Sequence, residues 1–215
     1  CSNSGTVTGG TGVHVSVGGI VGYCTGKVTN CSNSGAVTGT GYYVSVGGIV
    51  GDIYYDYGTA MVSDCYYLEQ DGLRGVGNEE ENKGVTPKDE DAYKSGEVAN
   101  LLNQASGEEE LWGQDFDKGY PVPLGSLSEE EREACKIYSV TFTYTLPVEG
   151  AEEKTITLYG NSDTPLVAPE ETAVEGYAVT WTPELPVTFG TENPTFTATF
   201  TKLYTLTITQ PTEGG

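Results

Sequence analysis

The sequence has few of the residues from which catalytic and metal centres are built. Its 215 residues include one His and five Cys, and no Cys-x-x-Cys pair occurs. Zinc sites usually need closely spaced Cys or His ligands, so this spacing argues against a zinc site. A Ser or Cys nucleophile activated by imidazole would have to use His14. We predict that the chain is not an enzyme and has no catalytic residues, metal or cofactor.

Positive charge is also scarce. The chain has 10 Lys and Arg against 31 Asp and Glu, which gives a net charge of −21. Nucleic acids and anionic membranes are bound by clustered Lys and Arg, so we predict no nucleic-acid partner. No apolar run is long enough to cross a membrane, and no signal peptide is visible, so we predict no membrane insertion in this fragment. The charge favours a soluble monomer.

The residues that are abundant favour strands and turns. Gly occurs 30 times and Tyr 15 times, and Thr and Val are frequent along the chain. Tyr, Thr and Val suit pleated, half-buried strands, and Gly suits the turns between them. We therefore predict a mainly β protein.

An internal repeat is the strongest feature of the sequence. CSNSGTVTG at 1–9 returns as CSNSGAVTG at 31–39, and SVGGIVG at 16–22 returns unchanged at 45–51. A period of about 30 residues, rich in Gly and β-branched residues, is typical of stacked repeats. Alignment of the copies places Val7 with Val37 and Val17 with Val46. We predict that each repeat is one coil of a short right-handed β-solenoid, or β-helix, with equivalent side chains stacked about 4.8 Å apart.

Alternation within each repeat predicts which side chains face the core. Valines take every second position before each SVGG segment, and a period of two places one set of side chains inside. The inward set is predicted to be Val13, Val15, Val17, Tyr42, Val44 and Val46. His14 and Tyr43 take the outward positions, and because the copies do not share His at this position, we interpret His14 as a surface residue.

Three of the five cysteines recur at the same place in the repeat, namely Cys1, Cys31 and Cys65. Free Cys is among the most buried residue types, so we predict a buried ladder of small apolar side chains. The alternative is a disulfide among the cysteines. An odd number of Cys prevents a complete disulfide framework.

The middle of the chain changes character. In residues 69–127 we expect a small, helix-containing cap that closes the open end of the solenoid, because bare terminal coils invite aggregation. Thr86-Pro87 is a helix start signal, and a second helix is expected over 97–104. Residues 128–136 predict a linker helix with a capping box formed by Ser128 and Glu131.

The last third is again strand-like. Four alternating segments, with Pro and Gly between them, occupy 137–202 and predict a separate small β domain. Residues 203–215 are expected to be the start of a further repeat or a tail. Asp115 to Gly119 imitates the opening of a calcium loop, but Ser126 stands where such a loop needs Glu, so no calcium site is predicted.

Two resemblances add to this interpretation. SGTVTG, VGGIVG and TNCSNSG in residues 1–68 resemble the GLUG-type repeats of bacterial surface proteins, and the stretch to about 127 resembles the tail that closes such arrays. YSVTF, LYG, EGYAVTW and TFTATFTK in 137–202 are similar to the Listeria–Bacteroides repeat, related to the internalin B-repeat, a β-grasp-like module. An immunoglobulin-like sandwich is the alternative fold for that domain.

These resemblances imply a fragment of a secreted or cell-surface bacterial protein at the cell wall. We predict an adhesin-like display scaffold whose partner is a host or cell-surface protein or a glycan. The alternative is a carbohydrate-binding module attached to a secreted hydrolase. Exposed aromatic side chains suit sugar rings and proteins alike. The candidate ligand-binding residues are Tyr43, Tyr54, Tyr55 and Tyr57.

Overall fold

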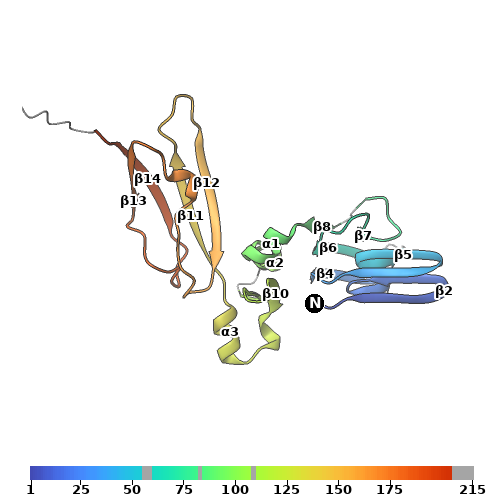
Figure 1. Cartoon of the computed structure of the whole chain (residues 1–215). Coiled ribbons are helices and arrows are strands. Elements are labelled where there is room, and N and C mark those ends of the chain that lie inside the picture. The colour runs from blue at the N-terminus through green and yellow to red at the C-terminus, as the bar shows by residue number, and fades with distance from the viewer. Residues whose placement is uncertain (55–59, 82–83, 108–109, 205–215) are drawn as a thin grey trace, which may run out of the picture. The chain divides into compact units, whose positions relative to one another are not determined.

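The structure is a computed structural model that describes residues 1–54, 60–81, 84–107 and 110–204 (Figure 1). The protein is mainly β, as predicted. The chain divides into two compact units, Cys1–Ile137 with Tyr159–Ser162, and Tyr138–Leu158 with Asp163–Gly215. Two of the predicted ligand residues, Tyr55 and Tyr57, and most of 203–215 lie outside the described residues.

Parallel strands build the first part of the first unit. They are β1 (Ser2–Asn3), β2 (Val7–Gly18), β3 (Val21–Cys24), β4 (Lys27–Asn33), β5 (Val37–Ile53), β6 (Met61–Leu68), β7 (Arg74–Val76) and β8 (Val85–Lys88). One sheet has the order β1-β4-β6-β8. In the other, β2 and β3 pair with one long strand, β5, which also pairs with β7. The stacked strands therefore continue to Lys88, beyond the end of the recognised repeats.

The strands of successive repeats pair in the register that the repeat predicts. Val7 lies opposite Val37, and Val17 lies opposite Val46, in a parallel pair interrupted by one register shift after Thr8. The pairing continues past the strand end, where the Ile20 N–H donates to the Ile49 carbonyl at 3.0 Å. Equivalent residues of the two repeats are thus neighbours in space, and Figure 1 shows β2 and β5 stacked side by side.

Glycines in the repeated VGGIVG segment allow the backbone to bend sharply. A Cβ atom on Gly18 would lie only 2.0 Å from the Val21 carbonyl oxygen, and one on Gly47 would lie 1.9 Å from the Val50 carbonyl oxygen. Real Cβ atoms do not approach backbone oxygens so closely, so these positions require residues without a side chain. The same turn is therefore made in both repeats.

The inward alternation is only partly correct. Val17 is 5% exposed, but Val13, Tyr42 and Val44, which were also predicted to face inward, are 66%, 79% and 40% exposed. The strand folds back on itself, so that Gly9 lies against Val17 and Gly39 lies against the side chain of Val44. At the tip of this narrow fold neither side of the strand faces a core, so side chains that point in either direction are exposed. We call this part of the two repeats, residues 7–17 and 37–46, the lobe.

The core of the stacked strands lies between the sheets. Its members are buried residues from both repeats and from the strands that follow: Cys24, Val28, Cys31, Ile49, Val50, Ile53, Val62, Cys65, Tyr67, Val76 and Val85. Cys31 lies opposite Cys65, and both are buried, as the predicted ladder requires. Cys1 is exposed at the edge of the ladder, and all five cysteines are free thiols, so the disulfide alternative is wrong.

A helical segment follows the stacked strands. It contains α1 (Glu90–Ser95), α2 (Glu97–Ser106), the antiparallel pair β9 (Trp112–Asp115) and β10 (Tyr120–Pro123), and the short 3-10 helix η2 (Leu124–Ser126). Thr86 and Pro87 do not begin the first helix, because they pair with Tyr66 and Tyr67 as part of β8. Pro is tolerated there because β8 is the last strand of its sheet. The helix begins after Asp89, whose carboxylate accepts the Ala92 N–H at 2.8 Å.

This segment packs against the side of the stacked strands instead of their open end. Tyr93, Leu102 and Trp112 are buried together with Tyr66 and Leu68 of β6. The Asn30 side chain donates to the Leu102 carbonyl, and the Tyr93 hydroxyl donates to the Asn33 carbonyl at 3.1 Å. Figure 1 shows α1 and α2 beside β4 and β6. The outer face of the β1-β4-β6-β8 sheet is therefore covered.

The predicted linker helix is α3 (Glu129–Cys135), which begins with the predicted capping box of Ser128 and Glu131. Among the described residues, no helix is long and apolar enough to cross a bilayer.

The second unit is one mixed sheet. Its strands are β11 (Tyr138–Thr145), β12 (Glu153–Gly160), β13 (Tyr177–Thr182) and β14 (Thr195–Lys202), with the 3-10 helix η3 (Glu170–Thr172) before β13. The order is β12-β11-β14-β13, with β11 and β14 parallel and β13 and β14 antiparallel. The core is aromatic, and Phe142, Tyr144 and Phe196 are its largest fully buried side chains.

Each unit contains one of the two Trp residues, which allows their unfolding to be followed separately. Val50 is 0% exposed. An unpaired carboxylate buried there would destabilise the unit by roughly several kcal/mol. We expect Val50→Asp to lower or abolish the urea midpoint reported by Trp112 in a Trp181→Phe background. The midpoint reported by Trp181 in a Trp112→Phe background should not change.

Val13→Asp is the matched control for this prediction, because Val13 is 66% exposed and belongs to the same strand system. It should change the free energy of unfolding of either unit by no more than about 0.5 kcal/mol. Simultaneous loss of both Trp transitions in Val50→Asp would show that the two units do not fold independently.

Candidate functional site

Aromatic rings form a column on the outside of the lobe. His14 of β2 lies opposite Tyr43 of β5, and their rings stack with centroids 5.0 Å apart and planes 12° apart. The Tyr42 ring meets Tyr43 edge-on at 4.8 Å. Tyr43 is 59% exposed. The register that pairs the strands also stacks these rings, so the column follows directly from the repeat.

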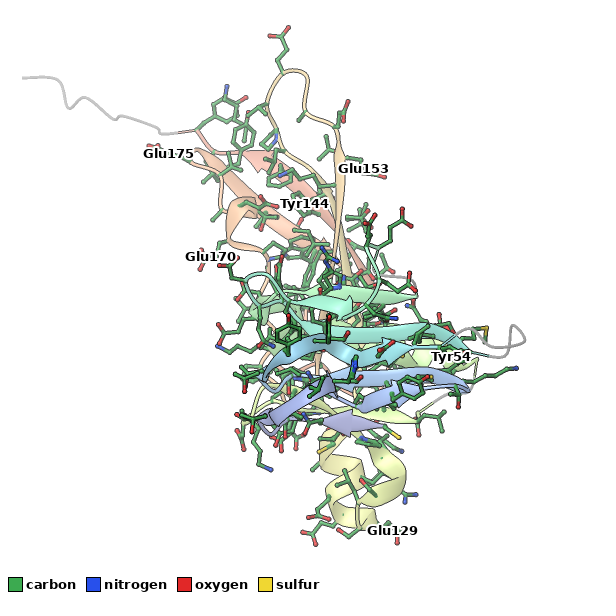
Figure 2. All side chains as sticks on the ribbon, turned by 90° about the vertical axis from the view of Figure 1, so that its right-hand side faces the viewer. Tyr54, Glu129, Tyr144, Glu153, Glu170 and Glu175 are labelled. Carbon is green, nitrogen blue, oxygen red and sulfur yellow. The ribbon has the colours of Figure 1, made fainter. Side chains whose placement is uncertain are left out.

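A second column lies further along β5. The rings of Tyr23 and Tyr54 stack with centroids 6.4 Å apart, and they are 53% and 52% exposed. Figure 2 shows Tyr54 on the outside of the stacked strands. Tyr23 lies opposite Asp52, two residues before Tyr54, so both columns belong to the β2-β5-β3 sheet.

A shallow groove of about 290 Å³ lies beside the first column. We call it the lobe groove. Its lining residues are His14, Val15, Ser16, Tyr43, Val44, Ser45 and Asp52. Ser16 lies opposite Ser45, so two hydroxyl groups stand next to two stacked rings. A flat ring face beside hydroxyl and carboxylate groups can bind a neutral sugar by stacking and hydrogen bonding. No Lys or Arg lines the groove, which makes it a poor site for an acidic ligand.

The predicted ligand residues occupy different places. Tyr43 lines the lobe groove, and Tyr54 belongs to the second column. The sequence predicted His14 to be an ordinary surface residue and did not identify Ser16, Ser45 and Asp52 as lining residues. The signal was present in part, because Ser16 and Ser45 occupy the same position in the two SVGGIVG segments. Nothing local to Asp52 in the sequence relates it to the other lining residues.

The segment that imitates a calcium loop makes other contacts. The Asp115 carboxylate accepts the Lys118 N–H at 3.0 Å and pairs with the Lys118 ammonium at 2.9 Å. Burial opposes ionisation of Asp115, but the contacts with Lys118 outweigh it and lower the pKa of this carboxyl. Among the residues that the structure describes, no group of three or more His, Cys, Asp or Glu is placed to hold a metal ion.

The buried thiols of Cys31 and Cys65 influence one another. The hydrogen bond from Cys65 lowers the pKa of Cys31, while the same bond and burial raise the pKa of Cys65. Their sulfurs also donate to backbone carbonyls two residues back, at Thr29 and Ser63. Both side chains are 4% exposed or less, so a molecule in solution cannot reach the sulfur atoms, and the two residues contribute to core packing.

The second unit has a groove of its own, of about 390 Å³. Residues of β11, β14 and the start of β12 line it, among them Thr143, Tyr144, Glu153 and Thr197 (Figure 2 labels Tyr144 and Glu153). Behind it, the Tyr144 hydroxyl donates to the Glu171 carboxylate, which also pairs with Lys154 at 3.1 Å. These contacts join β11 to η3 and serve the fold of the unit.

Comparison of the chain with protein-family models, curated proteins and solved structures finds no match. The resemblances to GLUG-type repeats and to the internalin B-repeat therefore stay predictions.

The Tyr144 contacts predict a pH dependence for the second unit. Burial, followed by the hydrogen bond to Glu171, raises the pKa of Tyr144 to about 12. An unfolded Tyr has a pKa of about 10, so the folded state favours the protonated phenol. This stabilisation is complete below about pH 10 and is lost as the pH rises to about 12. We expect the urea midpoint reported by Trp181 to fall across this range.

Tyr144→Phe removes the titrating hydroxyl and keeps the ring. In that variant the urea midpoint of the second unit should depend less on pH between about 10 and 12. An unchanged slope in Tyr144→Phe would mean that another group is responsible.

Proposed function

We propose that this chain is a non-catalytic part of a secreted or cell-surface bacterial protein, in which the first unit displays a binding face. The observation that carries the proposal is the register between the repeats. It stacks valines and cysteines inside and, at the same time, stacks His14 on Tyr43 and Ser16 beside Ser45 outside. Repetition thus builds an ordered outer surface on a rigid frame.

We infer that the first unit is a short right-handed β-solenoid. In support, the chain passes alternately through two parallel sheets, and each strand of the repeats pairs with its equivalent about 30 residues back, while β8 pairs with β6 after a shorter separation. A single core lies between the sheets and contains residues from both. The helical segment then covers one side of the solenoid and leaves the lobe uncovered.

For the second unit we favour a β-grasp-like module. A mixed sheet with a parallel central pair and the order β12-β11-β14-β13 fits such a module, with η3 in the place of a longer helix. An immunoglobulin-like sandwich needs two packed sheets, whereas the strands described here form one. The role we propose is that of a spacer in a surface protein.

The partner that best fits the lobe groove is a neutral cell-surface glycan. Stacked rings, two Ser hydroxyls and one carboxylate lie together there without a basic side chain. This composition equally suits the alternative function, a carbohydrate-binding module attached to a secreted hydrolase. In both cases the binding residues are the same and the chain itself does no chemistry.

A glycan array followed by titration of the best neutral glycan tests this proposal. Removing the stacking ring in Tyr43→Ala should weaken binding roughly 5- to 10-fold or more, since truncating a side chain at the centre of a contact costs about 1 kcal/mol or more. Tyr43→Phe should retain most of the affinity. Tyr204→Ala is the matched control, because Tyr204 is also highly exposed but lies in the other unit.

Two results would contradict the proposal. One is binding that is equally strong in Tyr43→Ala and in the unchanged protein, which would place the glycan elsewhere. The other is turnover of any polysaccharide by the purified chain, which would make it an enzyme.

A further inference from the structure

In the part of the chain that the structure describes, the edge of the lobe formed by β5 lacks a neighbouring strand. β2 pairs with one edge of β5 along its first half, whereas on the opposite edge β7 pairs only at Gly47 and Val50. The cause is the short connection after the two repeats. Only five residues, 69–73, join β6 to β7, where the two repeats have a full lobe. Among the described residues, no strand pairs with the free edge of β5 over Thr38–Ser45.

Side-chain amides bond to the β5 backbone before and after the part of this edge that lacks a strand. Gln70 accepts the Val37 N–H at 3.3 Å, and Asn78 both accepts the Ile53 N–H at 2.9 Å and donates to the Ile53 carbonyl at 3.0 Å. These two amides take the hydrogen-bonding positions that a next strand would have. Gln70 marks the start of the free section, and β7, which pairs with β5 at Gly47 and Val50, marks its end.

The direction of the backbone groups on this section follows from the pairing. The Gly47 carbonyl accepts the Gly19 N–H, so the backbone groups of Gly47 point toward the β2 side. Backbone groups alternate in direction along a strand, which places those of Val44 and Tyr42 on the free edge. Tyr42 is 79% and Val44 is 40% exposed, so apolar side chains stand beside these donors and acceptors.

The charges around the edge are negative. Asp52 lies beside Val44 in the lobe groove, and the exposed Glu69 and Asp71 flank the capping residue Gln70. The guanidinium of Arg74, at the end of the edge, donates to the Glu79 carbonyl. We propose that the free edge of β5 binds a short, extended, basic peptide segment by strand addition, with Val44 as the central backbone donor and acceptor.

A second copy of the chain fits this edge poorly. A net charge of −21 opposes self-association. In addition, β6 already occupies the position next to β4, so the first repeat of another copy has no room to stack in register. An isolated peptide strand meets neither obstacle. The peptide site shares Val44 and Asp52 with the lobe groove, but it depends on the backbone edge of β5 and not on the ring face of Tyr43.

The experiment uses the whole chain, labelled with ¹⁵N, and a peptide of about eight residues in which Lys alternates with Val and Thr. We expect the peptide to shift the Tyr42 and Val44 amide signals and to bind more weakly at high salt. The same peptide with N-methylated backbone amides should bind at least about tenfold more weakly, because strand addition depends on main-chain hydrogen bonds.

Two substitutions at one position separate backbone from side-chain effects. Val44→Pro removes the edge N–H without breaking a bond to β2 and should abolish binding, whereas Val44→Thr keeps the N–H and should retain it. The unfolding midpoint reported by Trp112 establishes that both variants are folded. If Val44→Pro does not fold, the affinity of the N-methylated peptide for the unchanged protein tests the proposal by itself.

Equal binding of the N-methylated peptide, or of Val44→Pro in folded form, would overturn the proposal. So would a concentration-dependent dimer that buries the Val44 amide, or an absence of any peptide binding. A glycan that still binds through Tyr43 in those cases would leave the proposed function intact.

Discussion

In-register parallel pairing between successive repeats is the constraint on which the rest of the first unit depends. It brings each residue of one repeat beside its equivalent in the next, as Val17 beside Val46 and Cys31 beside Cys65. A column that is apolar in one repeat is then apolar in the next, and the core is continuous from repeat to repeat. Glycines in VGGIVG make the turns that keep the register, because no side chain fits there.

The same pairing gives the outer surface its order. Side chains that point outward are also stacked on their equivalents, so His14 meets Tyr43 and Ser16 meets Ser45 without any dedicated packing. A small change between copies, such as His for Tyr, alters the surface without a cost to the core. Because the connection between β6 and β7 is too short to form a third lobe, no described strand pairs with the edge of β5 over Thr38–Ser45. The surface and the free edge are thus two consequences of one arrangement.

The errors of the sequence-based predictions have physical causes. Alternation placed Tyr42 and Val13 inside, but alternation defines only two sides of a strand, and at the tip of the lobe neither side has a core. Thr86-Pro87 resembled a helix start, yet β6 offered these residues a parallel partner and the helix began at Asp89 instead. The helical segment was expected over the open end, whereas Tyr66 and Leu68 on the outer face of β6 provide an apolar surface at the side.

The sequence by itself determined the mainly β class, the register of the repeats, the buried Cys31 and Cys65 and the capping box at Ser128. Each depends on local pattern or on identity between copies, which can be read along the chain. Only the tertiary structure decided that Asp52 lies beside Tyr43, that the helices cover one side of the stack, and that no described strand pairs with one edge of β5 over Thr38–Ser45. These depend on how far the chain turns between strands and on which surfaces then meet, and no local pattern encodes either.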